Sequence, residues 1–316
     1  MKPIRISAGV VNQTPMDWEG NERRILACIE DARREGAELL LLPELCVTGY
    51  GCEDMFFAAD LQERALAQLM RLAPHTKGLL VSVGLPLMYR NALYNTAALL
   101  ADGKLMGFAA KQNLAGDGVY YEPRWFAPWP EGEVRSVTIE GADYPVGDLV
   151  FECNDVRIGF EICEDGWAAS RPGAGHARLG VDLVLNPSAS HFAFGKQEVR
   201  KRLVLEASRA FGATYLYTNL LGNESGRLIF DGGVLVASAG KMVAESPRLS
   251  FREWQVTPVT IDLDDTRMQQ ARTVSTRPGF SEDDEEGVVV VPFDVSQCPV
   301  QHRGTVGGWQ VDGLCG

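Results

Sequence analysis

The sequence predicts an α/β fold in which two mixed β-sheets pack against each other between layers of helices. Segments with the pattern of buried strands alternate with amphipathic helical segments for most of the chain, which favours α/β layers. Several strand segments are joined in pairs by short turns, so the sheets must be mixed rather than purely parallel. About ten strands are expected, and two packed sheets accommodate that number better than one open sheet does.

The predicted elements follow one another from the N-terminus. Residues 4–11 have a strand pattern, and residues 21–38 form an amphipathic helix that closes at Gly36. Asp102-Gly103 separates two apolar runs, which is a strong hairpin signal. The segment 171–180 is too short and glycine-rich for a long helix. The other predicted strands and hairpins are 38–44, 78–86, 94–111, 156–163, 181–188, 214–220, 228–246 and 257–264, and the other helices are 60–73 and 197–212.

These patterns weaken after about Leu263. Residues 281–295, "SEDDEEGVVVVPFDV", are an acidic cluster followed by one apolar run, and residues 301–316 are rich in glycine. We therefore expect one domain over residues 1–263. Residues 264–316 are expected to form an acidic, glycine-rich tail or part of a linker.

Charge and cysteine usage narrow the class of protein. The chain has 30 basic and 42 acidic residues and a net charge of -12, which would repel nucleic acids and anionic membranes. No apolar run approaches the roughly 20 residues of a membrane span, and the N-terminus has no secretory leader pattern. Seven cysteines without a C-x-x-C pair argue against a disulfide framework or a structural zinc site. We expect a cytoplasmic protein.

Cys163 is the first candidate for chemistry. In "RIGFEICEDGW" it ends an apolar strand and is followed by two carboxylates and a glycine, a pattern that a packing cysteine does not need. A nucleophilic cysteine requires a group that removes its proton or lowers its pKa. One option is a histidine, and the four histidines, none of which has a distinctive local context, are His75, His176, His191 and His302.

Carboxylates and a lysine at other strand ends are the second option. Glu44 follows the apolar run Leu39–Leu42 and Pro43, and partial burial there would raise its pKa and suit it to act as a general base. The alternative interpretation is that Glu44 is a solvent-exposed residue that ends the strand. Lys111 ends another apolar strand and could stabilise an oxyanion, or it could be an ordinary surface lysine. Ligands of α/β sheets collect at such strand ends, so Glu44, Lys111 and Cys163 are expected to converge.

Four segments together resemble the nitrilase superfamily of carbon–nitrogen hydrolases. They are "LLLLPELCVTGY", "KQNLAGDGVYYEPRWF", "GFEICEDGW" and "LVLNPSASHF", and the resemblance covers roughly residues 3–265. They look most like the glutaminase branch found in glutamine-dependent NAD synthetases of the eukaryotic-like form. The resemblance implies a four-layer α-β-β-α sandwich with a nitrilase-like amidohydrolase domain at residues 1–263.

The resemblance also implies roles for particular residues. Glu44, Lys111 and Cys163 would form a catalytic triad, and Glu122 would be a second active-site carboxylate that orients Lys111; its alternative is a surface salt bridge. The backbone N–H of Glu164 would help stabilise the oxyanion. The reaction would be cysteine-dependent hydrolysis of the L-glutamine side-chain amide through a γ-glutamyl thioester, with neither a metal nor an organic cofactor. Serines that would contact the rest of the substrate are Ser188 and Ser190.

The resemblance leaves the partner and the substrate open. A full NAD synthetase has an ATP-using domain with an S-G-G-x-D-S phosphate loop, and this sequence has no such motif. The chain would then supply ammonia to a synthetase domain or subunit, and superfamily members commonly form homo-oligomers. The alternatives are an amidase or carbamoylase for another small amide and a catalytically idle scaffold subunit, which the presence of all four site residues argues against.

Overall fold

The computed structural model describes residues 2–222, 224, 228–273 and 287–295. Most strands fall into two sheets. The strands of the larger sheet are β1 (Pro3–Val11), β2 (Leu39–Leu41), β3 (Leu80–Tyr89), β4 (Ala92–Ala101), β5 (Lys104–Ala110), β6 (Val134–Ile139), β7 (Ala142–Gly147) and β16 (Trp254–Asp262). They are arranged in the order β16-β1-β2-β3-β4-β5-β7-β6, with parallel and antiparallel neighbours.

The second sheet has seven strands and is also mixed. They are β8 (Val150–Cys153), β9 (Val156–Phe160), β10 (Leu183–Ser188), β11 (Thr214–Asn219), β14 (Val234–Ser238), β15 (Lys241–Glu245) and β17 (Val288–Val291). Their order is β15-β14-β11-β10-β9-β8-β17. A small separate pair consists of β12 (Leu221–Gly222) and β13 (Phe230–Asp231).

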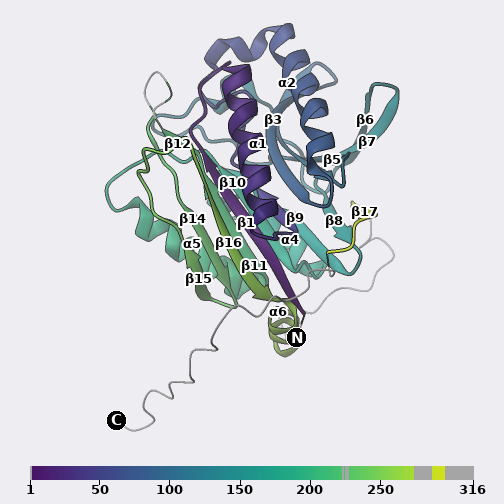
Figure 1. Cartoon of the computed structure of the whole chain (residues 1–316), viewed down its shortest axis with the longest axis vertical. Coiled ribbons are helices and arrows are strands. Elements are labelled where there is room, and N and C mark those ends of the chain that lie inside the picture. The colour runs from purple at the N-terminus through teal and green to yellow at the C-terminus, as the bar shows by residue number, and fades with distance from the viewer. Residues whose placement is uncertain (1, 223, 225–227, 274–286, 296–316) are drawn as a thin grey trace.

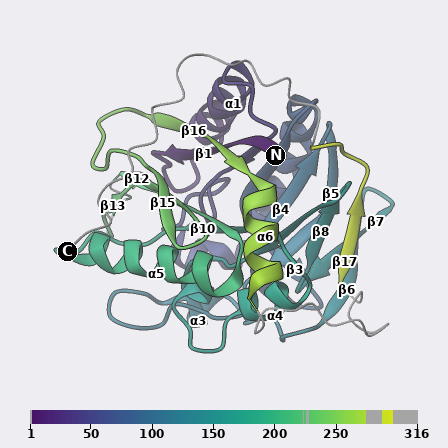
Figure 2. The same ribbon diagram turned by 90° about the horizontal axis from the view of Figure 1, so that it is seen from below.

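Helices cover the outer faces of both sheets (Figures 1 and 2). The helices α1 (Trp18–Arg34) and α2 (Ala59–Leu72) contact the larger sheet, whereas α4 (Pro172–Arg178) and α5 (Lys196–Phe211) contact the smaller one. The predicted four-layer α-β-β-α sandwich is therefore confirmed. The remaining helical segments are η1 (Glu53–Phe57), η2 (Ala73–Thr76), α3 (Glu122–Trp125), η3 (Cys163–Gly166) and α6 (Leu263–Arg272).

The alternation of side chains along the strands explains why the layers stack. On β1, Ile4, Ile6, Ala8 and Val10 all belong to the apolar core between the two sheets, together with side chains of the smaller sheet. Val11 instead belongs to the core beneath α1 and α2. Because strand residues alternate between faces, one apolar strand can contribute to both cores.

Two regular elements lie within the segment for which the sequence predicts an irregular tail. Helix α6 follows β16 directly, and the side chain of Asp262 accepts a hydrogen bond from the Asp264 N–H at its start. Strand β17 pairs in parallel with β8 and forms one edge of the smaller sheet. The helix is short and mostly polar, so its pattern is weak, and the pairing of β17 depends on a distant strand. The domain boundary at residue 263 stays a prediction.

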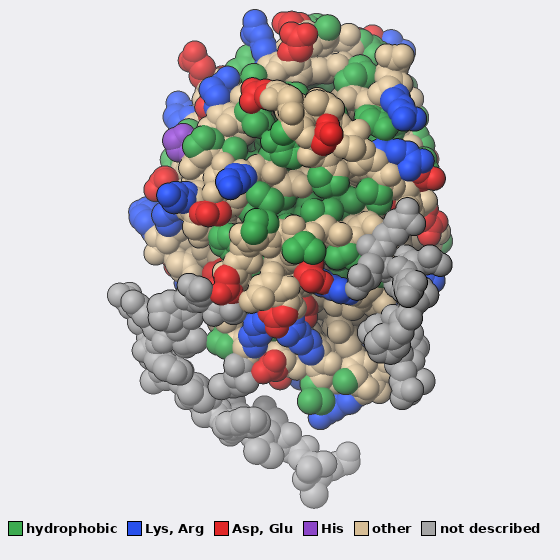
Figure 3. All heavy atoms as spheres, turned by 90° about the vertical axis from the view of Figure 1, so that its right-hand side faces the viewer, with side chains coloured by type: hydrophobic (Ala, Val, Ile, Leu, Met, Phe, Trp, Pro, Cys, Tyr) green, Lys and Arg blue, Asp and Glu red, His purple; other side chains and the backbone are tan. Residues whose placement is uncertain are grey.

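The described surface combines charges of both signs. In Figure 3, which shows the right-hand side of Figure 1, hydrophobic side chains gather at the centre, and acidic and basic side chains surround them. The acidic excess of the chain therefore does not form one continuous patch on that face. No helix in the described part of the chain has both the length and the apolar character needed to cross a bilayer.

Candidate active site

Glu44 lies in a turn that follows β2. The turn passes so close to β3 that a Cβ atom on Gly84 would lie 2.4 Å from the Leu45 nitrogen and 2.9 Å from the Glu44 carbonyl carbon. Leu45 has a φ of 49°, in the left-handed region that non-glycine residues rarely adopt. Glycine at position 84 thus makes room for a tight turn that directs the Glu44 side chain into the protein interior, where it is buried.

Lys111 follows β5 and is connected to its neighbours on both sides. Its backbone N–H donates to the Asn95 carbonyl at 2.9 Å, and its carbonyl accepts from the Trp129 N–H at 2.9 Å. The side chain is completely buried. A lysine without contact to water is not an ordinary surface residue, and burial of its charge requires close partners.

Two carboxylates supply those partners. Lys111 Nζ lies 2.6 Å from Glu44 Oε1 and 2.8 Å from Glu122 Oε1. Glu122, the first residue of α3, is also completely buried. The surface alternatives for Glu44, Lys111 and Glu122 are therefore wrong, because all three form one buried ionic cluster.

Further hydrogen bonds fix both carboxylates. The Asn95 side-chain amide donates to Glu44 Oε1 at 2.8 Å, and the Ala189 N–H donates to Glu44 Oε2 at 2.8 Å. Glu122 accepts a bond of 2.7 Å from the Tyr50 hydroxyl and one of 2.9 Å from the Ala115 N–H. These donors hold the carboxylates in one orientation, as a preorganised site requires.

Cys163 begins η3, three residues after the end of β9 at Phe160, and is buried. Its φ is 47°, again in the left-handed region, so the chain is held in an unusual conformation at this residue. Burial raises the pKa of the Cys163 thiol, and the charge of Glu44 raises it further, while Lys111 lowers it. The protein therefore keeps Cys163 as a thiol near neutral pH, and attack by its sulfur requires a base.

Glu44 has the electrostatic properties of that base. Burial raises its pKa to about 7, against the lowering effect of Lys111. The pKa of Lys111 is raised above its usual range, because the charges of Glu122 and Glu44 outweigh the effect of burial. The site thus combines a permanent cation with a carboxylate that can exchange a proton near neutral pH.

A cavity of about 180 Å³ opens onto Cys163. It is smaller than the roughly 300–1,000 Å³ of typical ligand pockets and suits a small molecule. Its lining residues are Ala115, Asp117, Tyr120, Cys163, Glu164, Trp167, Ser190, His191 and Lys196.

The two predicted substrate serines are placed differently. Ser190 lines the cavity, and its hydroxyl accepts a bond of 3.2 Å from Arg200. Ser188 is buried and does not line the cavity; its hydroxyl donates to Asn186 Oδ1 at 2.6 Å. Regular alternation would place residues 188 and 190 on the same face, but β10 ends at Ser188, so the pattern does not extend to Ser190. Substrate contact by Ser188 stays a prediction.

Lys196, Tyr120 and Trp167 also line the cavity, although no role for them is predicted from the sequence. The Lys196 ammonium lies 5.7 Å from the centre of the Trp167 ring and 3.1 Å from His191 Nδ1. Burial lowers its pKa, as does the charge of Arg200. Its local signal is a position just before the predicted helix 197–212, which does not reveal the distant cavity that it lines.

His176 and His191 are bonded to groups other than Cys163. His191 lines the cavity, but its Nδ1 lies 3.0 Å from the Tyr120 hydroxyl and close to Lys196. His176 is paired with Asp148 at 2.8 Å. His75 is exposed, and His302 lies outside the described residues. Carboxylates and Lys111 act on the pKa of Cys163, which favours the carboxylate option over a Cys–His dyad.

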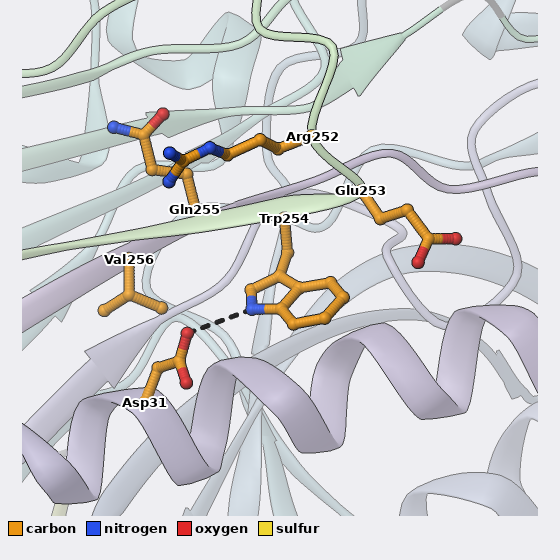
Figure 4. A pocket seen from close by; sticks show the side chains of 6 residues that line it. All are labelled: Asp31, Arg252, Glu253, Trp254, Gln255 and Val256. Atoms are coloured by element: carbon orange, nitrogen blue, oxygen red, sulfur yellow. Dashed lines mark hydrogen bonds between the residues drawn. The ribbon is translucent and has the colours of Figure 1, made fainter.

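A second depression lies between α1 and β16 (Figure 4). Its main contact is a hydrogen bond of 3.0 Å from Trp254 Nε1 to Asp31. It contains no nucleophile beside a base, so its residues do not form a second catalytic arrangement. Within the described ranges, no three His, Cys, Asp or Glu side chains are placed to hold a metal ion.

The fold and this cluster define a class of protein. The chain belongs to the carbon–nitrogen hydrolase family, whose model matches residues 5–271. The predicted resemblance is therefore confirmed. Its relatives include the glutamine-dependent NAD(+) synthetases of Saccharomyces cerevisiae, 35% identical over 285 residues, and of Homo sapiens, 32% identical over 307 residues. These alignments cover 86% and 93% of this chain but 40% and 43% of the relatives.

Solved structures agree with this assignment. A glutamine-dependent NAD(+) synthetase from Cytophaga hutchinsonii is 46% identical, with a TM-score of 0.78 over 82% of this chain and 43% of that one. The Nesterenkonia AN1 amidase of the nitrilase superfamily is 24% identical, with a TM-score of 0.66 over 85% of this chain and 94% of the amidase, and it shares the fold. The chain thus spans about two fifths of its synthetase relatives.

Proposed function

We propose that the chain is a glutaminase that releases ammonia from L-glutamine through a γ-glutamyl thioester. The observation that carries the proposal is the buried cluster of Glu44, Lys111 and Glu122 beside Cys163, which lines a small cavity. The names of its synthetase relatives, which refer to glutamine, support the choice of substrate.

In the first half of the reaction, the Cys163 sulfur attacks the side-chain amide carbon while Glu44 accepts the thiol proton. The tetrahedral intermediate collapses as Glu44 returns that proton to the departing nitrogen, which leaves as ammonia. In the second half, Glu44 takes a proton from water, and the resulting hydroxyl attacks the thioester. The carbon–sulfur bond then breaks, glutamate is released, and the Cys163 sulfur takes back the proton from Glu44, which restores the thiol.

Lys111 supplies the fixed positive charge that the oxyanion needs. Its ammonium is held by Glu44 and Glu122, so little reorganisation is required when negative charge develops. Glu122 keeps the ammonium in place through its bonds with Tyr50 and Ala115. The N–H of Glu164, the residue after the nucleophile, would be the second oxyanion donor.

The charges around the cavity are complementary to the α-carboxylate and α-ammonium groups of a free amino acid. Lys196 would pair with the substrate α-carboxylate, and the carboxylates of Asp117 and Glu164 would attract the α-ammonium group. Ser190 would add a hydrogen bond. A simple amide lacks both charges, so the arrangement favours glutamine over an uncharged amide.

The relatives suggest how the ammonia is used. Because they are named NAD(+) synthetases and are more than twice as long, we infer that an ATP-using synthetase domain or subunit is the acceptor. In this proposal residues 1–263 are the amidohydrolase unit, which assembles as a cytoplasmic homo-oligomer.

Ammonia release from the purified chain tests the proposal. L-glutamine, L-asparagine, propionamide and glutaramic acid, which lacks the α-ammonium group, would be compared with and without an NAD synthetase, with Cys163→Ala as the inactive control. Release from glutamine that depends on Cys163 is expected. Turnover of another amide, but not of glutamine, would refute the glutaminase assignment. No turnover of any amide, even with the synthetase, would refute both the glutaminase assignment and the proposed amide hydrolysis.

We expect Lys196→Met to raise the KM for glutamine about 10- to 100-fold with little change in kcat. The substitution removes a charge-assisted hydrogen bond to the α-carboxylate, which contributes about 1.5–3 kcal/mol to binding in ground and transition states alike. Steady-state kinetics measure the effect. Lys201→Met, on the same helix but with its ammonium bound to Glu245, is the matched control and should leave KM unchanged. An unchanged KM in Lys196→Met would contradict this assignment.

A further inference from the structure

Asp165 is a buried carboxylate that takes no part in the proposed reaction. It lies two residues after Cys163 in η3 and is only 1% exposed. Burying a carboxylate is costly unless hydrogen bonds compensate for the lost water. The donors that surround Asp165 therefore indicate what its burial achieves.

The first group of hydrogen bonds closes the turn that carries the nucleophile. Asp165 Oδ2 accepts from the Ile162 N–H at 2.9 Å, and the Asp165 N–H donates to the Ile162 carbonyl at 3.1 Å. Cys163 and Glu164 are the two residues enclosed between these bonds. Because Cys163 has a positive φ, this turn needs such support to keep its shape.

The second group of hydrogen bonds reaches the other sheet. Asp165 Oδ1 accepts from the backbone N–H of Gln112 at 3.1 Å and that of Asn113 at 2.7 Å, and from the Asn113 side-chain amide at 3.1 Å. Gln112 and Asn113 directly follow Lys111. One carboxylate therefore joins the end of β5, in the larger sheet, to the turn after β9, in the smaller sheet.

This connection matters because apolar packing alone does not fix the distance between the two sheets. The core between the sheets consists of aliphatic and aromatic side chains, whose attraction is non-directional. Hydrogen bonds, in contrast, fix distance and direction. Lys111 follows a strand of the larger sheet and Cys163 follows a strand of the smaller one, so their spacing depends on the polar links between the sheets at this end.

We propose that Asp165 is a positioning residue that sets the spacing between Lys111 and Cys163. The proposal rests on the proposed function only in taking those two residues as reaction partners. Asp165 holds the strand end that carries the cation against the turn that carries the sulfur, and does not touch the substrate.

Asp165→Asn tests this role. Asparagine has one acceptor oxygen, so its amide group must face either the Ile162 N–H or the donors of residues 112 and 113. We expect kcat for glutamine to fall about 100-fold, the loss associated with a displacement near 1 Å, with KM nearly unchanged. Alkylation of Cys163 by iodoacetamide, followed by mass spectrometry of its peptide, should slow as well.

Asp182→Asn is the matched control. Asp182 is equally buried and accepts a backbone bond of 3.0 Å from Arg157, but it lies at the opposite ends of β9 and β10. Its replacement should lower thermal stability without slowing alkylation or lowering kcat. If Asp165→Asn does not fold, Asn113→Ala removes only one of the bonds, and a several-fold loss of kcat at unchanged KM is then expected.

The outcomes separate this proposal from the glutaminase assignment. A folded Asp165→Asn with wild-type alkylation and kcat would overturn the positioning role, and so would an equal effect of Asp182→Asn. Should the wild type hydrolyse another amide instead of glutamine, the same comparison would be made with that amide. A selective effect of Asp165→Asn there would support the positioning role while the substrate assignment fails.

Discussion

Lys111→Met is expected to lower the free energy of unfolding by about 3–5 kcal/mol and to lower the rate of amide hydrolysis at least 1,000-fold. Both effects have one cause: the substitution leaves Glu44 and Glu122 facing each other in a dry interior and removes the cation proposed to stabilise the oxyanion. Urea unfolding measures the first effect and ammonia release the second. Protonation of the carboxylates should relieve the repulsion, so the stability difference from wild type should shrink as the pH falls.

Two further variants distinguish these causes. Adding Glu122→Gln to Lys111→Met removes one of the facing charges and should recover part of the stability but none of the activity. Lys104 lies at the exposed beginning of β5, the strand that precedes Lys111, and Lys104→Met should change neither stability nor activity. Wild-type stability of Lys111→Met would contradict the view that the cluster is ionised.

Glu44→Gln is expected to lower kcat about 1,000-fold or more, because a glutamine cannot accept the thiol proton. For the wild type, kcat/KM should fall as the pH drops through about 7, since the raised pKa of Glu44 means that its carboxyl is protonated below that value. The residual activity of Glu44→Gln should lack this acidic limb. Measurement of kcat/KM from pH 5 to 9 tests both points.

Glu38→Gln is the control for this substitution. Glu38 precedes β2, whereas Glu44 follows it, and the carboxylate of Glu38 accepts a 3.2 Å bond from the Arg5 N–H. Its replacement should keep the acidic limb. The pKa of Asp165 is also raised to about 7 by burial, so a limb that persists in Glu44→Gln would assign the titration to another carboxylate.

The strand ends of the site could be predicted because the relevant signals are local. An apolar run identifies a buried strand, and the residue after it must lie at the sheet end, which places Glu44, Lys111 and Cys163 in the same region. Glu122 was expected there through the resemblance alone. Its bond to Tyr50 joins residues 72 positions apart, and no local pattern encodes that contact.

The elements that sequence reasoning missed are those whose stability depends on tertiary contacts. The β6–β7 hairpin extends from the edge of the larger sheet, and its exposed faces give little apolar alternation (Figure 1). Strand β17 is an apolar run that becomes a strand only by pairing with β8. Lys196 was missed for a related reason, because the start of a helix identifies neither the cavity nor the charge that its side chain meets.

The pairing of β1 with β16 has a consequence for biosynthesis. These strands join over their full length, from Pro3 opposite Asp262 to Val11 opposite Trp254, although about 250 residues separate them in the chain. Synthesis proceeds from the N-terminus, so β1 leaves the ribosome long before its partner exists. Until residue 262 emerges, one edge of an apolar strand stays open to pairing with other nascent chains. The high contact order of this closing step makes it slow, and chaperone protection of β1 is most valuable in that interval.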